Sequence, residues 1–290
     1  MSHRTTLRPG GKISPYQPGA ALQGAEIHRG GRNMDATVYR YDGSFSGFLC
    51  CIYRAIRARE EPALILAGDE MPALLFPEIA IHTDPDQARR VSRAIAGKIG
   101  PQVLEFAQRA HLTALAGREL YLLALLRRGF REGPLVLEDM ADPTVCRLRR
   151  AVCHLEREAH LYKGFVRFQV RGEALSAVIQ PKNRVLPLLA EHFRERFAAQ
   201  ALLIYDETHR EALLCARGRS RVVPLQDFRQ DGPGAEELAF QRLWRGFFQA
   251  VSIPQRENPL CQRTHMPKRY WDQLTEMRPA AGPSLPQRAT

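Results

Sequence analysis

The spacing of apolar side chains changes near residue 160, and this change most constrains the fold. Upstream, apolar residues recur every three to four positions, as Phe45, Phe48 and Ile52 do, which is typical of amphipathic helices. Downstream, residues 164–170 alternate between apolar and polar side chains, which indicates a half-buried strand. We therefore expect an α+β protein with a mostly helical N-terminal half, followed by a small antiparallel sheet with helices packed on one face.

Local composition divides the chain further. Residues 1–33 are rich in Gly, Pro, Arg and Gln and poor in aliphatic side chains, and the last residues resemble them. Such segments cannot offset the entropy lost on ordering. Met34 opens a sequence that looks like a natural protein start. We expect a disordered N-terminal extension (1–33), a mainly helical region (34–160), an α+β region (161–277) and a disordered tail (278–290), with 34–277 forming one unit.

Two Asp-Pro pairs predict helix starts in the N-terminal half. Asp84-Pro85 and Asp142-Pro143 each place a capping side chain before a first-turn proline. The first of these helices should reach about Gly97, and the second should run to about His160. The other elements expected here are one strand over 36–41 and helices that start near residues 44, 101 and 118.

The apolar pattern of the C-terminal half predicts two strands, then one helix, then two more strands. An amphipathic helix over 183–197 separates two pairs of expected strands. The strands cover 164–170, 175–180, 201–205 and 211–216, and a further helix covers 234–251. The order strand–strand–helix–strand–strand is the basis for the small antiparallel sheet.

The charge of the chain is only a mild indication of its partner. The formal net charge is +11, but residues 1–33 contribute +4 and residues 278–290 contribute +2, which leaves +5 for residues 34–277. This excess is compatible with a polyanionic partner such as DNA.

Several classes of protein are disfavoured by what the sequence lacks. Six cysteines are scattered without a CxxC pair, so we expect free thiols in a reducing cytoplasm, with no metal and no cofactor. No run of about 18 apolar residues predicts a membrane span. No apolar segment near the start predicts a secretory signal. We therefore expect a cytoplasmic protein that does not contact a membrane.

Residues 256–271 form the densest group of polar and aromatic side chains. The segment holds four Lys or Arg side chains, one histidine and two large aromatic residues, and it is expected to be mostly loop. Such loops often contact a ligand, and cations beside aromatic rings can hold phosphates and stack bases. The alternative is a C-terminal segment that its aromatic rings attach to the body of the protein. The residues expected to bind are Arg256, Asn258, Gln262, Arg269, Tyr270 and Trp271.

A second group lies where the long helix passes into the first strand of the C-terminal half. Glu158, His160, Lys163 and Arg167 could form an anion or substrate site at the edge of the sheet. The alternative is a helix-to-strand junction with ordinary surface charges.

Two further candidates lie downstream. His192 and Arg196 are four residues apart and share one helix face, where they could hold a phosphate or transfer a proton. A hydrogen-bonded structural histidine is the alternative. Asp206 and Arg210 flank an expected turn, and their simplest role is an ion pair across that turn.

Five segments together resemble a bacterial family of DNA metabolism and DNA repair proteins built on a DUF4130 domain. The segments are Val38–Phe48, Lys163–Phe168, His192–Phe197, Ile204–Asp206 and Met266–Trp271. The resemblance covers nearly all of residues 35–277, with one departure at Leu202-Leu203, where the family often has an aromatic residue. It implies a partner that is a radical SAM protein with a helix-hairpin-helix element. It also implies a link to uracil-DNA-glycosylase-like domains.

Three functional hypotheses follow. The first is an accessory protein that binds DNA through Lys163, Arg167, His192, Arg196, Arg210, Arg256, Asn258, Gln262, Arg269, Tyr270 and Trp271. The second is an enzyme that acts on DNA by acid/base chemistry, with Glu158, His160, His192 and Asp206 as candidate catalytic residues. The third is an adaptor for the radical SAM protein without direct DNA contact.

Overall fold

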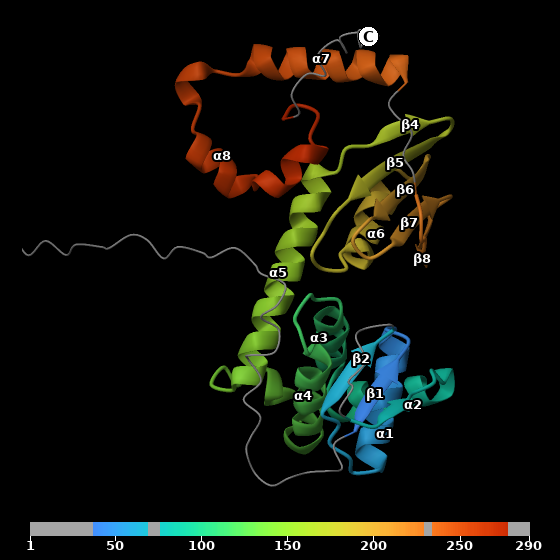
Figure 1. Cartoon of the computed structure of the whole chain (residues 1–290). Helices are drawn as coiled ribbons and strands as arrows, with labels where there is room; N and C mark the ends of the chain where they lie inside the picture. The colour runs from blue at the N-terminus through green and yellow to red at the C-terminus, as the bar shows by residue number, and fades with distance from the viewer. Residues whose placement is uncertain (1–36, 69–75, 229–233, 278–290) are drawn as a thin grey trace, which may run out of the picture. The chain divides into compact units, whose positions relative to one another are not determined.

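The computed structural model describes residues 37–68, 76–228 and 234–277 (Figure 1). The expected disordered segments, 1–33 and 278–290, and the start at Met34 lie outside these described residues.

A three-stranded parallel sheet opens the N-terminal half. Strand β1 (Val38–Tyr41) lies between β2 (Leu64–Ala67) and β3 (Glu78–Ala80). It pairs with both in parallel. The sequence predicted β1 alone, because β2 and β3 are too short to show a period of their own. Val38 and Tyr39 project to opposite faces of this sheet, and both are completely buried, so both faces of β1 are covered.

Four helices and a short 3-10 turn complete this half. They are α1 (Phe45–Arg57), α2 (Pro85–Lys98), α3 (Pro101–His111), α4 (Arg118–Glu132) and η1 (Pro134–Leu137). The first Asp-Pro prediction is confirmed, since Asp84 Oδ1 accepts the backbone N–H of Asp86 at 2.8 Å and α2 begins at Pro85. The apolar faces of these helices and of β1 share one hydrophobic cluster.

Helix α5 (Pro143–Phe165) belongs to two hydrophobic clusters. Its first half, with Val145 and Leu148, packs in the N-terminal cluster, and its second half, with Leu155 and Tyr162, packs in a C-terminal cluster. The second Asp-Pro prediction is also confirmed, because α5 begins directly after Asp142. The helix continues five residues beyond the expected end at His160, so residues 164 and 165 are helical and not part of a strand.

The C-terminal half contains a five-stranded sheet in the order β4-β5-β6-β7-β8. Its elements are β4 (Gln169–Arg171), β5 (Ala174–Ile179), α6 (Leu186–Arg196), β6 (Ala201–Asp206), β7 (Glu211–Ala216) and β8 (Arg219–Pro224). The α+β class is confirmed, but the sheet is mixed. Strands β5 and β6 pair in parallel because α6 returns the chain between them, while the other pairs are antiparallel.

The last elements are α7 (Ala235–Val251), η2 (Pro254–Arg256), α8 (Pro259–His265) and η3 (Lys268–Gln273). The expectation that 256–271 is mostly loop is therefore wrong. Asn258 caps α8 by accepting the backbone N–H of Cys261 at 2.9 Å, and Pro259 occupies the first helical position. No helix in the described part of the chain is long and apolar enough to cross a membrane.

Candidate functional site

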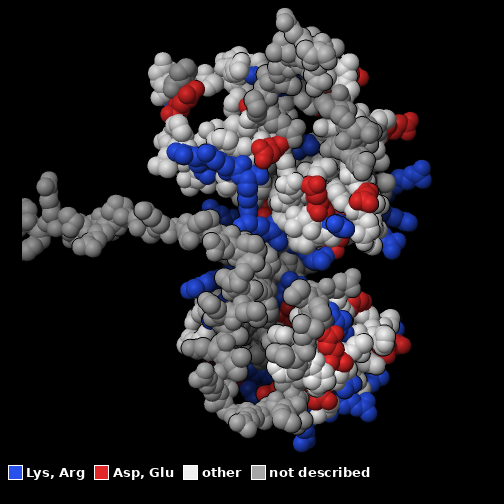
Figure 2. Space-filling view, viewed as in Figure 1, with Lys and Arg blue, Asp and Glu red and all other residues white. Residues whose placement is uncertain are grey.

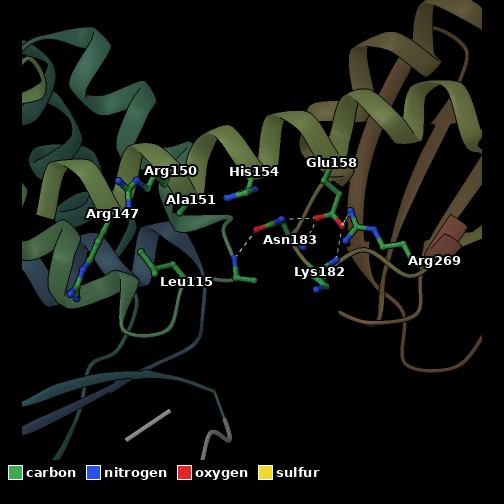
Figure 3. A pocket seen from close by; sticks show the side chains of 10 residues that line it. Leu115, Arg147, Arg150, Ala151, His154, Glu158, Lys182, Asn183 and Arg269 are labelled. Carbon is green, nitrogen blue, oxygen red and sulfur yellow. Dashed lines mark hydrogen bonds and ion pairs between the residues drawn. The ribbon is translucent and has the colours of Figure 1, made fainter. Parts of the chain in front are cut away.

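A cavity of about 530 Å³ lies beside α5, and five of its ten lining residues are basic. Arg147, Arg150, His154 and Glu158 come from α5, while the other polar side chains come from the loop before α6 and from η3 (Figure 3). These last are Lys182, Asn183 and Arg269. Residues widely separated in the sequence therefore meet at one surface.

The helical repeat explains the row on α5. Residues 147, 150, 154 and 158 are spaced by three or four positions, so they share one face of the helix. The small side chain of Ala151 lies in the same row and leaves room above the helix. At 1.5 Å per residue the row is about 16 Å long.

Glu158 contacts the loop before α6 and η3 at the C-terminal end of the row on α5. Its side chain is only 3% exposed. Oε1 accepts the backbone N–H of Lys182 at 3.0 Å and lies 3.3 Å from the Arg269 guanidinium. Oε2 accepts the backbone N–H of Asn183 at 2.9 Å and its side-chain amide at 2.6 Å. Because both oxygens are engaged by donors, Glu158 positions the loop and η3 against α5.

Asn183 continues this connection toward the N-terminal half. Its Oδ1 accepts the backbone N–H of Ala114 at 2.8 Å, and the backbone N–H of the next residue, Arg184, donates to Leu112 at 2.9 Å. The loop that follows α3 is thereby fixed beside the loop that precedes α6, and Ala114 and Leu115 form the apolar part of the cavity wall.

Most of the cations at the cavity are not neutralised. Among the described residues, the side chains of Arg150, His154 and Lys182 have no hydrogen-bond or ion-pair partner. Arg147 donates to the Tyr121 hydroxyl and lies 5.5 Å from the centroid of that ring, and neither neutral contact removes its charge. Arg269 is the one that faces a carboxylate, that of Glu158. The cavity therefore favours an anion. Figure 2 also shows Lys and Arg side chains that adjoin one another on part of the molecular surface.

Two of the predicted site residues, Glu158 and Arg269, lie at this cavity. His160 and Lys163 instead line a larger hollow of about 900 Å³, together with acidic residues such as Glu156 and Glu191. Burial and the positive charges of Lys163 and Arg196 hold the pKa of His192 below its ordinary value, so its ring is neutral near pH 7. The Arg196 guanidinium lies 5.6 Å from the centroid of the Phe197 ring.

Arg167 is engaged in an internal ion pair. It donates to Glu276 at 2.7 Å, and the Glu276 side chain is 6% exposed. The indole N–H of Trp244 donates to the other oxygen of Glu276 at 3.0 Å. Arg167 thus connects the end of α5 to the C-terminal segment.

Asp206 is completely buried, and its partner is His209 rather than Arg210. Its oxygens accept the backbone N–H of His209 at 3.0 Å and face the ring Nδ1 at 2.7 Å. The expected ion pair across the turn is therefore wrong. Arg210 faces Gln226, at 3.4 Å, and adopts a left-handed backbone with φ of 53°. Asp206 acts here as a turn residue.

Residues 256–271 do not form one binding surface. Arg256, Asn258 and Gln262 are exposed. Tyr270 is 1% exposed and packs edge-on against Tyr162, with ring centroids 5.0 Å apart, so its ring faces do not meet solvent. The Trp271 indole donates to the carbonyl of Met266 at 2.9 Å. The aromatic rings attach this segment to the body of the protein, which was the alternative interpretation of the sequence.

The predicted residues thus do not converge on a single cleft, and five polar residues of the cavity were missed. These are Arg147, Arg150, His154, Lys182 and Asn183. The spacing of the first three along a predicted helix could have revealed them, since it places two arginines and a histidine on the face that also carries Glu158. Lys182 and Asn183 lie in a loop with no comparable pattern.

A region built on a mixed sheet is joined through one long helix to a mainly helical region, and a basic cavity lies beside that helix, so the protein is of the α+β class. The chain belongs to the family described as "Domain of unknown function (DUF4130)", which matches residues 116–276. The matched range contains the whole cavity except Ala114 and Leu115, and it excludes the N-terminal sheet. Neither the curated proteins nor the solved structures contain a match to this chain.

Proposed function

We propose that the protein binds nucleic acid through the basic cavity beside α5. The observation that carries this proposal is that Arg147 and Arg150 of α5 and Lys182 of the neighbouring loop line one cavity and have no carboxylate partner among the described residues, although Arg147 donates to the Tyr121 hydroxyl. Charges of this kind hold phosphate oxygens and release the counterions condensed on a nucleic acid.

The shape of the site favours a polymer over a single small anion. The basic part of the row on α5, from Arg147 to His154, extends over about 10 Å, which matches the rise of about three nucleotides at 3.4 Å each along one strand. The excess charge of +5 on residues 34–277 acts in the same direction. The apolar wall at Ala114 and Leu115 offers a surface for a sugar or a base.

The biological setting is proposed from the family resemblance. We place the protein in bacterial DNA repair or DNA modification, as an accessory protein that acts with a separate radical SAM or glycosylase-type enzyme. Acid/base catalysis by this chain has less support, because both oxygens of Glu158 and of Asp206 are already engaged by donors from the protein.

Fluorescence anisotropy with labelled DNA tests the proposal. The double variant Arg150→Gln/Lys182→Gln removes two unpaired cations from the cavity. The matched double variant Arg93→Gln/Lys98→Gln removes two exposed cations from α2, so both proteins have the same net charge. We expect the slope of log K against log salt to become shallower by about 1.5 in the cavity variant, at roughly 0.7–0.9 per phosphate contact.

The α2 variant should keep the slope of the unsubstituted protein. Equal losses in the two variants would mean that DNA responds only to net charge, and no binding at low salt would contradict the proposal altogether.

A further inference from the structure

The two faces of the five-stranded sheet have different surroundings. Ala177 and Ile179 of β5 and Ile204 of β6 pack with α6 in the C-terminal hydrophobic cluster. Alternate residues of a strand project to opposite faces, so Val178 and Tyr205, which pair across β5 and β6, belong to the other face. On this second face a hollow of about 400 Å³ is lined by the sheet, α7 and η3, and its volume is in the range of small-molecule sites.

Three aromatic rings contribute apolar surface to this hollow, those of Phe168, Tyr205 and Phe228. The rings of Tyr205 and Phe228 are inclined at 48°, with centroids 5.4 Å apart. Phe168 and Phe228 are half-buried, so part of each ring remains accessible. Flat heterocycles stack on rings of this kind, as unstacked bases do in complexes with nucleic acids.

Neutral polar groups line another part of the hollow. Among the described residues, the side chains of Gln169, Gln273 and Thr275 have no hydrogen-bond partner, and all three are half-buried. A carboxamide offers two N–H donors and one carbonyl acceptor, and a hydroxyl offers both functions. A ligand that satisfies these groups must therefore carry acceptors as well as donors.

The charges at the hollow disfavour an anion. Three carboxylates line it, those of Glu207, Glu237 and Asp272. The guanidinium in its lining, that of Arg167, is already paired with Glu276 at 2.7 Å. A phosphate would therefore be repelled. An ammonium ion would be attracted, but it has no acceptor for the N–H groups of the unpartnered amides.

We infer that this hollow binds an unpaired nucleobase that carries an exocyclic amine, such as adenine. A base is flat and uncharged, and its ring nitrogens accept from the amides of Gln169 and Gln273 while its amine donates to a carboxylate or an amide oxygen. Glutamine forms a bidentate pair with adenine, and carboxylates accept from the amine of cytosine. Thymine presents a carbonyl oxygen in place of the amine, and the carboxylates would repel it.

The inference rests on the proposed function, since the base belongs to the nucleic acid bound at the basic cavity. Helix η3 borders both sites, because Arg269 lines the cavity while Asp272 and Gln273 line the hollow. Residues 269 and 273 are about 8 Å apart along a 3-10 helix, which is little more than the rise of two nucleotides. A strand bound at the cavity therefore has a base within reach of the hollow, provided that the base leaves the stack.

Fluorescence anisotropy with two labelled duplexes tests the inference. The duplexes differ only in one bulged nucleotide, deoxyadenosine or thymidine, so the ratio of the two affinities isolates recognition of the base. We expect the unsubstituted protein to bind the deoxyadenosine bulge about tenfold more tightly. Gln169→Leu/Gln273→Leu keeps the side-chain volume but removes both amides, and its ratio should fall to about one, with circular dichroism showing that it is folded.

Two further variants serve as controls. Gln102→Leu/Gln200→Leu removes two exposed amides elsewhere and should keep the tenfold ratio. Arg150→Gln/Lys182→Gln should weaken binding of both duplexes by the same factor, so its ratio should also be kept. A ratio of one in the unsubstituted protein, or a tenfold ratio in the Gln169/Gln273 variant, would overturn the inference and leave the proposed function intact.

Saturation-transfer difference NMR of the full chain with free nucleosides gives a readout that needs no DNA binding. Transfer to deoxyadenosine should exceed transfer to thymidine and should be lost in the Gln169/Gln273 variant. Failure to bind either duplex would contradict the proposed function, and the nucleoside measurement would then decide the inference: without transfer to deoxyadenosine, it is overturned.

Discussion

Glu158 and Asn183 are joined by two hydrogen bonds to a single oxygen atom. Glu158 Oε2 accepts both the backbone N–H and the side-chain N–H of Asn183, at 2.9 Å and 2.6 Å. The carbonyl oxygen of the same amide accepts the N–H of Ala114. This pair therefore links α5 to two loops, and it determines where Lys182 stands at the basic cavity.

Replacement of Glu158 should destabilise the protein strongly. Glu158→Ala leaves three N–H donors and the Arg269 guanidinium without their acceptor, at a cost of about 3 kcal/mol. Urea unfolding monitored by circular dichroism measures this change. Glu156→Ala is the control, because Glu156 is on the same helix but its ion pair with Arg109 is exposed, and it should change stability by less than about 0.5 kcal/mol. Equal effects would contradict the assignment of Glu158 as the residue that holds the loops.

Tyr270 separates the two interpretations of the C-terminal segment. As a core residue packed against Tyr162 and Phe165, it should cost about 3–5 kcal/mol when replaced by alanine. Tyr270→Phe keeps the ring and removes the hydroxyl that accepts from Arg269, so it should cost about 1 kcal/mol or less. A ring that stacked on DNA would give the reverse result, with alanine reducing DNA affinity while the free energy of unfolding stayed constant.

The sequence predicted those elements whose signals are local. Asp84-Pro85 and Asp142-Pro143 located the starts of α2 and α5, because a capping carboxylate and a first-turn proline act on the adjacent backbone alone. The parallel pairing of β5 with β6 was missed, since it depends on how α6 crosses the sheet and not on the pattern within either strand.

The candidate site was predicted only in part, for a related reason. Glu158 and Arg269 were chosen as single residues, but their partners Lys182 and Asn183 lie in a loop whose position is set by long-range hydrogen bonds. Tyr270 was assigned to a binding surface because an aromatic residue in a polar segment is compatible with either role. Only packing against α5 decides between them.

His111 should make stability depend on pH. Burial and the positive charges of Arg118 and Arg184 lower the pKa of His111 to about 3, so the folded ring stays neutral. Below pH 6.5 the unfolded chain binds a proton that the folded protein does not, and stability falls as pH falls. The loss should be roughly 2 kcal/mol between pH 6.5 and 5.

The measurement is the free energy of unfolding at several values of pH from 7 to 5. His111→Gln should flatten this dependence, whatever its effect on stability at pH 7. His82→Gln, at an exposed position, should keep the slope of the unsubstituted protein. An unchanged slope in the His111 variant would show that other groups cause the dependence.

Asp142 should contribute stability that is lost at a lower pH. Burial raises the pKa of Asp142, but the N–H groups of Val145 and Thr144 and the Arg128 guanidinium outweigh it, and the pKa lies below 3.8. Its contribution is present above about pH 4 and disappears as pH falls through the folded pKa.

Asp142→Ala removes the cap of α5 and should cost about 1–2 kcal/mol at pH 7, whereas Asp142→Asn keeps a capping oxygen and should cost less. The difference in free energy of unfolding between the unsubstituted protein and Asp142→Asn should shrink as pH falls from 5 to 3. The exposed control Asp227→Asn should follow the unsubstituted protein throughout this range. If the difference for Asp142→Asn stays constant with pH, the ionised carboxylate is not its source.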